Sequence, residues 1–204
     1  MAELALFAAA AVGWVGVVAF FRRARAWLPY YVVGASGCAI LVVVGGREFL
    51  PLESVIRVAT AESVHMVAPL IGIKTTLEHV APGSLMVIGV PHQDEWTVLA
   101  VGLESSGLLE SAALLGLVAF FPAQTGTSRL ATILIALALT FIANVFRVLI
   151  IVATVGYLGQ DYLDFAHVVV GRVVFFVIAI GIFWFAITAP TLRRVNARLA
   201  EVPA

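Results

Sequence analysis

Long apolar stretches dominate this sequence and restrict what it can fold into. A helix needs about 20 apolar residues to cross the roughly 30 Å hydrocarbon core of a bilayer. Five stretches approach or exceed that length: residues 4–21, 28–45, 107–122, 130–158 and 165–189. Of the 204 residues, 62% are hydrophobic and only 12% are charged, against about 25% charged in a soluble domain. The sequence therefore predicts an all-α, polytopic membrane helix bundle of about five spans.

Charge and cysteine content exclude several classes of protein. Twelve basic residues are balanced by twelve acidic residues, so no basic stripe remains for nucleic acid. Cys38 is the single cysteine, which excludes an intrachain disulfide, a thiolate zinc cluster and a CxxC redox motif. Glu62, His65, His79 and His92 show no metal-ligand spacing such as HxxxH. We therefore expect neither a metal site nor a cofactor.

The arginines predict how the spans are oriented. They follow the first span, lie between the third and fourth spans, and follow the fifth: Arg22, Arg23, Arg25, Arg129, Arg193, Arg194 and Arg198. Threading five spans through these loops puts every arginine cluster on one side, which the positive-inside rule makes cytoplasmic. The N-terminus and residues 46–105 are then expected to face outward.

The predicted outer segment is more than a linker. Residues 52–70 mix apolar and charged residues, which favours an amphipathic helix near the membrane surface. Residues 84–90 and 96–101 are rich in β-branched side chains and predict a β-hairpin. We expect two N-terminal spans, an extracytoplasmic helix and hairpin, a three-helix membrane core and a cytoplasmic tail, at residues 1–45, 46–104, 105–190 and 191–204 respectively.

Polar residues within the later spans are functional candidates, because a bilayer makes ionisable groups costly. They are Glu104, Ser105, Ser106, Glu110, Asn144, Arg147, His167 and Arg172. Under the predicted orientation all of them lie in the outer half of the membrane, although the three spans run in alternating directions. A random scatter of polar residues would not sort in this way.

Each of these residues also has a purely structural interpretation. A serine at the start of a span is often a helix cap or a small packing residue, and His167 could simply be solvated. Arg147 needs a buried acid or carbonyl partner if it is structural. Glu110 and Arg172 are plausible partners in a structural ion pair. Asn144 is interpreted as an interhelical hydrogen-bond anchor.

Together, Ser105, Arg147 and His167 supply a hydroxyl, a permanent cation and an imidazole at one membrane face. Acyl transfer requires a nucleophile, a base for its proton and a positive group where the oxyanion develops. A guanidinium suits the last role because it stays charged and presents two donors as a fork.

Three short blocks in the chain resemble the exosortase/archaeosortase family of membrane transpeptidases. They are ESSGL at 104–108, NVFRV at 144–148 and HVVVG at 167–171, and the resemblance covers roughly residues 56–176. The family pattern has cysteine followed by Ser or Thr, Gly and Leu, then Asn, two apolar residues and Arg, then His with a Gly four residues later.

Ser105 stands where this pattern has cysteine, and Cys38 matches none of the blocks. A thiol ionises near neutral pH, whereas a serine hydroxyl needs a general base during attack. Three explanations remain open. The chain is a natural serine enzyme with His167 as base, a noncatalytic family member that binds sorting signals, or an engineered Cys-to-Ser form.

The resemblance implies a membrane-embedded protease/transpeptidase that cleaves C-terminal sorting signals of secreted proteins at the outer membrane face. Such a signal comprises a short motif, a transmembrane helix and a basic tail, and the acceptor would be a lipid or glycan of the envelope. Ser105 would be the nucleophile, Arg147 would stabilise the oxyanion, and His167 would act as base and then acid. Glu104 and Asn144 would support them. The alternatives are a noncatalytic scaffold and, less favoured because the polar groups cluster at one face, a small transporter.

Overall fold

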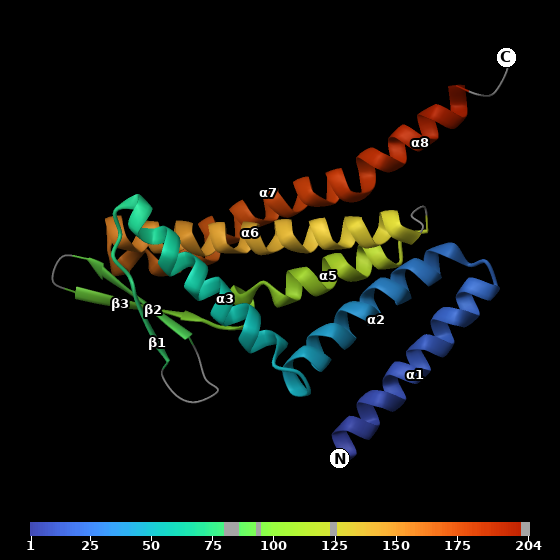
Figure 1. The fold of residues 1–204 in the computed structure, drawn as a ribbon, viewed down its shortest axis with the longest axis horizontal. Helices are drawn as coiled ribbons and strands as arrows, with labels where there is room; N and C mark the ends of the chain where they lie inside the picture. The colour runs from blue at the N-terminus through green and yellow to red at the C-terminus, as the bar shows by residue number, and fades with distance from the viewer. Residues whose placement is uncertain (80–85, 93–94, 123–125, 201–204) are drawn as a thin grey trace. The chain divides into compact units, whose positions relative to one another are not determined.

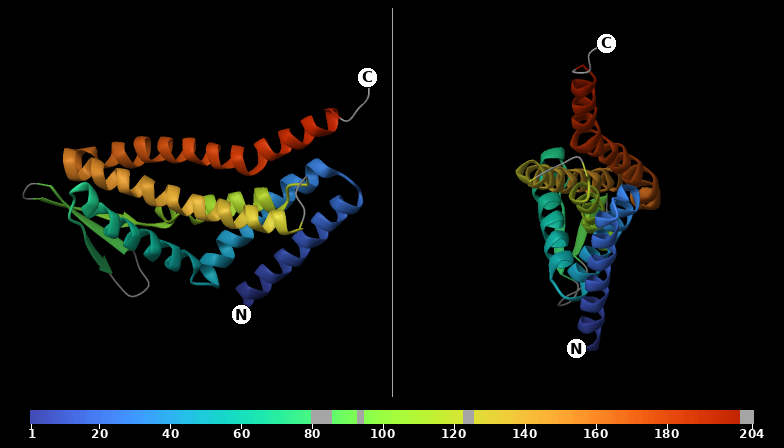
Figure 2. Two further views of the ribbon diagram at one scale, coloured as in Figure 1. Left: turned by 45° about the horizontal axis from the view of Figure 1, so that its top comes forward. Right: turned by 90° about the vertical axis from the view of Figure 1, so that its right-hand side faces the viewer.

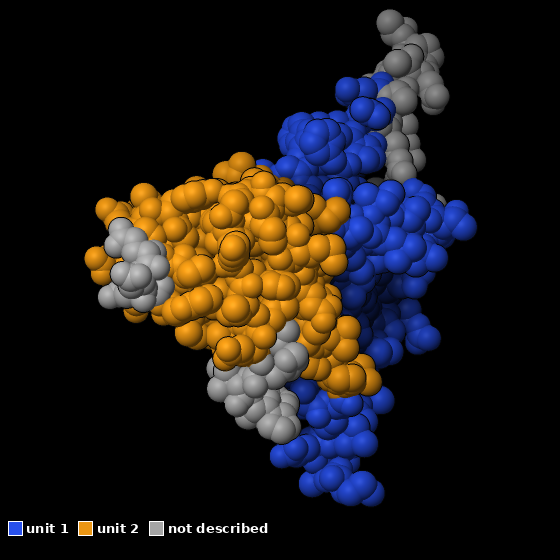
Figure 3. All heavy atoms as spheres, turned by 60° about the vertical axis from the view of Figure 1, so that its left-hand side comes forward, with its two compact units in different colours: residues 1–49, 110–139, 180–204 blue, residues 50–109, 140–179 orange. Residues whose placement is uncertain are grey.

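The computed structural model describes residues 1–79, 86–92, 95–122 and 126–200, and it forms two compact units (Figures 1 and 3). Unit 1 comprises residues 1–49, 110–139 and 180–204, and unit 2 comprises residues 50–109 and 140–179. Helix α6, Gly126–Leu158, is one uninterrupted helix of 33 residues that contributes to both units (Figure 2).

Unit 1 consists of helices that are apolar over most of their length. Its elements are α1 (Ala2–Arg23), α2 (Trp27–Glu48), most of α5 (Leu108–Ala119), the first part of α6, the end of α7 (Arg172–Phe183), a π-helical segment (Trp184–Thr188) and α8 (Ala189–Ala200). Val18 is the single buried residue of α1. A helix with so much exposed apolar surface requires an apolar solvent, which a bilayer provides.

Small residues let the helices of unit 1 approach one another closely. The Trp14 indole N–H donates to the Val33 carbonyl at 2.9 Å, and a methyl group at Gly37 would overlap the Trp14 ring. A methyl group at Gly116 would likewise meet the Ala35 carbonyl oxygen. Small residues at such contacts are typical of helix pairs in membranes.

Unit 2 combines helices with a small sheet. Its elements are α3 (Leu52–Val67), a 3₁₀ turn (Ala68–Ile71), β1 (Thr76–His79), β2 (Met86–His92), β3 (Glu95–Val101), α4 (Leu103–Ser106), the last part of α6, a 3₁₀ turn (Gln160–Tyr162), a π-helical segment (Phe165–Gly171) and most of α7 (Arg172–Phe183). The strands pair antiparallel in the order β1-β2-β3.

The core of unit 2 lies between one face of this sheet and the helices α3 and α6. The sheet, α3, α6 and the π-helical segment contribute Ile88, Val90, Leu99, Val101, Ala61, Val64, Val148, Ile151, Val152, Val155 and Ala166. Burial alternates along β3, since Thr97, Leu99 and Val101 are buried whereas residues 96, 98 and 100 are exposed, as expected for a strand with one covered face.

The predicted fold class is confirmed. Within its described residues the structure is mostly helical, has five helices long and apolar enough to cross a membrane, and carries a small antiparallel sheet. The predicted hairpin is observed as β2 and β3. Strand β1 was missed because its four residues are too few to show a period-two pattern.

Two predicted helices differ in detail from those observed. The span predicted at residues 107–122 contains α5, which begins just after Gly107 as expected but ends at Ala119, so that its 12 residues measure about 18 Å. Conversely, Leu52–Ile71 qualifies as a candidate span, although its mean hydropathy is 1.2 against 2.5 for Gly126–Leu158. The helix predicted at 52–70 is therefore present, and its placement at the membrane surface stays a prediction.

Candidate active site

Ser105 lies on α4, a single helical turn that directly follows β3. Gly102 precedes this turn in an extended conformation, and its carbonyl oxygen accepts a hydrogen bond from the Ser105 N–H at 3.1 Å. Ser105 is 5% exposed and Ser106 is fully buried. The Ser105 backbone is therefore fixed within one turn of the end of β3.

Gly107 ends this turn in a conformation that favours glycine. Its φ is +80°, a left-handed region that costs an L-residue with a side chain about 1–2 kcal/mol. A Cβ atom at this position would also lie 3.0 Å from Cγ of Asn144. Only glycine satisfies both the turn and the close approach of α6.

Asn144 joins α6 to the turn that carries Ser105. Its Nδ2 donates to the Ser105 carbonyl oxygen at 2.9 Å, and the bond is buried. The side chain is 1% exposed, and its Oδ1 is buried without a hydrogen-bond partner among the described residues. Asn144 thus holds the backbone of Ser105 and has one acceptor available.

Helix α3 contacts the same turn from another direction. Thr60 donates a long hydrogen bond of 3.5 Å to the Ser106 carbonyl oxygen, while the Ser106 hydroxyl accepts from the Leu108 N–H at 3.2 Å. One turn before Thr60, the buried Arg57 lies 3.8 Å from the Glu53 carboxylate. These α3 contacts could not be predicted, because the mixed composition of residues 52–70 indicates an amphipathic helix but not its partners.

Arg147 lies one turn after Asn144 on α6. It is 4% exposed, and its guanidinium carbon is 5.7 Å from the centre of the Phe175 ring on α7, a separation at which a cation and an aromatic face attract. The structure therefore places the permanent positive charge of Arg147 one helical turn after Asn144, the residue that bonds to the Ser105 carbonyl.

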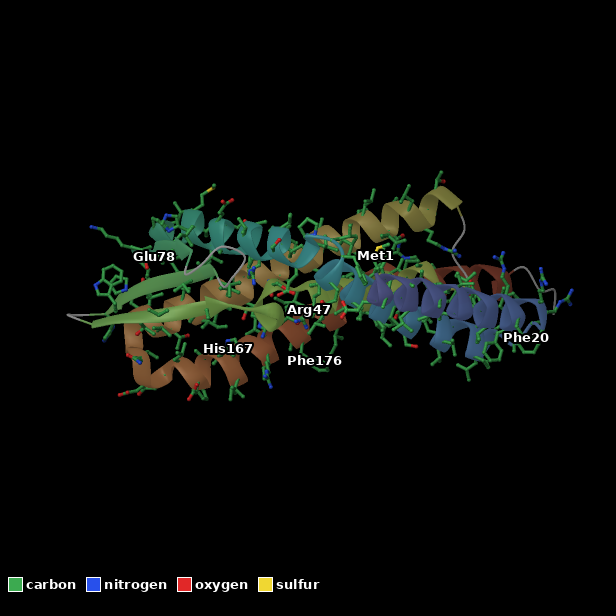
Figure 4. The ribbon with its side chains drawn as sticks, turned by 90° about the horizontal axis from the view of Figure 1, so that it is seen from below. Met1, Phe20, Arg47, Glu78, His167 and Phe176 are labelled. Atoms are coloured by element: carbon green, nitrogen blue, oxygen red, sulfur yellow. The ribbon has the colours of Figure 1, made fainter. Side chains whose placement is uncertain are left out.

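His167 belongs to the π-helical segment that precedes α7, and it is half-buried (Figure 4). A Cβ atom at Gly171 would lie 3.0 Å from Cδ1 of Ile151, and Phe175 lies over Arg147, so the two helices run antiparallel. His167 is then about 10–12 Å along the helix axis from the Phe175 contact. That the Ser105, Arg147 and His167 side chains share one pocket stays a prediction.

The remaining candidates are Glu104, Glu110 and Arg172. The Glu104 side chain is outside the part of the structure that is described. Glu110 is half-buried on α5 in unit 1, and Arg172 is exposed at the start of α7 in unit 2. Both make interactions within the protein, and the ion pair between them stays a prediction.

The described residues contain no group of three or more His, Cys, Asp or Glu side chains that could hold a metal ion. Unit 2 contains three buried polar groups near this turn. They are the Ser105 side chain, whose backbone carbonyl is bonded to Asn144, the unbonded amide oxygen of Asn144, and the guanidinium of Arg147. This set can hold and polarise a carbonyl group and supply a hydroxyl nucleophile to it.

The fold and this group of residues define a multi-pass membrane protein with a buried polar centre in unit 2. The model of the transmembrane exosortase family (Exosortase_EpsH) matches residues 1–184, so the chain belongs to this family. The resemblance carried by the three sequence blocks is thereby confirmed. No curated protein and no solved structure matches the chain. Membership implies the processing of sorting signals, and members are generally transpeptidases.

Proposed function

We propose that this chain cleaves C-terminal sorting signals of secreted proteins at the outer membrane face and transfers the new carboxyl end to a lipid or glycan acceptor. The main observation in support of the proposal is that hydrogen bonds from α6 and within α4 fix the turn that contains Ser105. Its carbonyl is held by Asn144, and Arg147 is buried on the next turn of the same helix. Family membership supplies the substrate class.

In the proposed reaction the Ser105 hydroxyl oxygen bonds to the carbonyl carbon of the scissile peptide. His167 takes the hydroxyl proton, a step that requires its imidazole to come within hydrogen-bond reach of Ser105. Arg147 stabilises the resulting oxyanion. The carbon–nitrogen bond then breaks, and His167 returns the proton to the leaving amine. Finally, a hydroxyl or amino group of the acceptor attacks the acyl ester on Ser105. His167 takes the proton of the acceptor and returns it to the Ser105 oxygen as the ester bond breaks.

The nucleophile is tested by comparing Ser105→Ala, Ser105→Cys and Ser106→Ala at matched membrane levels. The readout is the release of the C-terminal helix from a reporter that ends in a sorting signal. We expect Ser105→Ala to abolish cleavage and Ser105→Cys to raise it. Ser106→Ala, which removes the neighbouring hydroxyl, should change cleavage by no more than about fivefold, since one lost cap costs about 1 kcal/mol.

A noncatalytic role as a scaffold is the second candidate, and the serine in place of the family's cysteine favours it. Unchanged processing by Ser105→Ala would support the scaffold. Equal cleavage by Ser105→Cys and the wild type, with none by Ser105→Ala, would instead identify a natural serine enzyme.

The outward position of the site is also a proposal, and it rests on the arginine distribution. In a Cys38→Ala background, single cysteines at Glu78 in β1 and Asn196 in α8 would be treated with an impermeant thiol reagent in intact cells. We expect labelling at position 78 alone. Labelling at position 196 alone would reverse the orientation.

A further inference from the structure

The sheet of unit 2 has two edges that differ in how well they are protected. Strand β1 has four residues, contains Glu78 and follows Lys74, whereas β3 has seven residues and no charge after Glu95. Proteins usually protect sheet edges with short strands, charges or prolines, because a long apolar edge pairs readily with another chain. The β1 edge has such protection, and the β3 edge has none.

Pro91 indicates which backbone groups of β3 point outward. It lies opposite Trp96 in the ladder between β2 and β3, and it has no N–H to donate. Since bonded and non-bonded pairs alternate along an antiparallel ladder, residues 95, 97, 99 and 101 bond to β2. The N–H and C=O groups of Trp96, Val98 and Ala100 therefore point away from β2.

These outward groups have no strand partner within the described ranges, where β3 pairs with β2 alone. The side chains on the uncovered face are also accessible, with Trp96 58% and Val98 60% exposed. Lipid cannot hydrogen-bond to an open sheet edge. The edge therefore faces water or a polypeptide that supplies matching groups.

The β3 edge leads directly to the candidate nucleophile. Val101 ends the strand, and the bond from the Ser105 N–H to the Gly102 carbonyl keeps Ser105 within one turn of that end. Seven residues of strand extend over about 23 Å. A peptide lying along this edge would have about six residues beside β3 before it reached Ser105.

We propose that the β3 edge binds the extended recognition segment of the substrate as a fourth strand, and that this strand runs parallel to β3. The inference rests on the proposed function, since it assumes that the scissile carbonyl lies at Ser105. Residues before that carbonyl lead away from Ser105, as do the earlier residues of β3, so the two chains run in the same direction. Main-chain hydrogen bonds then supply affinity, and alternate side chains supply specificity.

Disulfide trapping tests the pairing without requiring turnover. The protein carries Cys38→Ala and Ser105→Ala together with Val98→Cys or Ala100→Cys. The probe is a secreted reporter ending in the sorting signal of a host protein, with single cysteines scanned through the six residues before the cleavage site. The matched control is Glu78→Cys on the protected β1 strand.

We expect Val98→Cys to form adducts at alternate reporter positions, because side chains on one face of a sheet recur every second residue. Ala100→Cys should trap positions two residues closer to the cleavage site, and Glu78→Cys should give at least about tenfold less adduct. A shift of two residues in the opposite direction would refute the parallel alignment. Adducts at consecutive positions, or only between two copies of the protein, would overturn the inference.

A second measurement uses the intact nucleophile and follows cleavage of the same reporter. Val98→Pro removes an outward N–H but leaves the bonds to β2, whereas Val98→Ala retains the N–H and removes only the side chain. Because both variants lose the valine side chain and only proline loses the N–H, we expect cleavage to fall at least about fivefold further with proline than with alanine, the cost of about one hydrogen bond. Equal activity of the two variants would count against edge pairing.

The two proposals can fail separately. Alternate adducts without any cleavage by the wild type would leave the binding edge standing and remove the proposed function. Cleavage that depends on Ser105, in the absence of alternate adducts, would retain the enzyme and remove the edge. Absence of both results would remove both proposals.

Discussion

Helices α1 and α3 show how differently the two units use their residues. Helix α1 of unit 1 has 22 residues and buries only Val18. Helix α3 of unit 2 has 16 residues and buries four, two of which, Arg57 and Thr60, are polar. Unit 1 thus presents apolar surface to its surroundings, whereas unit 2 packs specific side chains around a sheet and a serine-bearing turn.

The comparison implies that the same type of substitution has different consequences in the two units. Lipid tails are as apolar as the side chains that they contact. Exchanging one apolar side chain for another on a lipid-facing helix therefore changes the stability of the protein little. In a packed interior, adding or removing even one methylene group changes the packing and the stability of the fold. Paired substitutions, one in each unit, can therefore break or sharpen the comparison.

The largest difference is expected between Arg147→Lys in unit 2 and Arg23→Lys in unit 1. Lysine keeps the charge but loses the two-donor fork, and removing one donor from an oxyanion site typically costs about 10²–10³ in rate. We expect Arg147→Lys to lower reporter cleavage about 100-fold and Arg23→Lys to change it less than about twofold. A similar change in both variants would contradict a specific role for the guanidinium fork of Arg147 in the site.

Glycine substitution should give the next largest difference. In Gly107→Ala the new methyl group meets Asn144 at a positive φ, whereas a methyl group added at Gly16 in α1 would enter open space. The strain of about 1–2 kcal/mol and the displacement of Asn144 are expected to lower cleavage about 10- to 50-fold. Gly16→Ala should leave cleavage and membrane level unchanged. Normal cleavage by Gly107→Ala would contradict the described turn.

Helix α6 allows the comparison to be made within one element. Asn144 in unit 2 holds the Ser105 carbonyl, whereas Thr132 in unit 1 bonds only to the Ser128 carbonyl one turn earlier. We expect Asn144→Ala to lower the rate of cleavage about tenfold, because the turn loses its anchor, and Thr132→Ala to have no measurable effect. Glutamine carries the same amide on a side chain that is one methylene longer. Normal cleavage by Asn144→Gln would therefore show that the bond to the Ser105 carbonyl does not require the exact position of the Asn144 amide.

The spans could be predicted because hydropathy is a local property of the sequence. Residues 2–23 and 126–158 each carry enough apolar residues to identify a helix without knowledge of its neighbours. The end of α5 at Ala119 could not be predicted, because Phe120 and Phe121 continue the apolar stretch beyond it. Strand β1 is defined by its pairing with β2, and its own four residues show no pattern.

The candidate site was only partly accessible from the sequence. Ser105, Asn144 and Arg147 stand out because polar residues are rare in apolar stretches. Thr60 does not stand out, since its contact with Ser106 joins residues 46 positions apart. The contact of Arg147 with Phe175 is also long-range, and an aromatic residue in an apolar span carries no signal of its partner.

The smallest predicted effect concerns that aromatic contact. Phe175→Leu keeps an apolar side chain but removes the ring over which Arg147 lies at 5.7 Å. Cation–π contacts are worth about 0.5–2 kcal/mol, and this contact, close to the roughly 6 Å limit of the interaction, is assigned the lower part of that range, about 0.5–1 kcal/mol. Loss of this amount should lower cleavage about two- to fivefold, by loosening the guanidinium while leaving its charge and fork intact. The matched change in unit 1 is Phe20→Leu. Phe20 is 65% exposed, and we expect no change in cleavage there.

If Phe175→Leu also leaves cleavage unchanged, α7 does not position Arg147, and the contacts of Arg147 within α6 and with its other neighbours suffice. If combining Phe175→Leu with Arg147→Lys costs no more than Arg147→Lys alone, the ring acts through the guanidinium, as the geometry predicts.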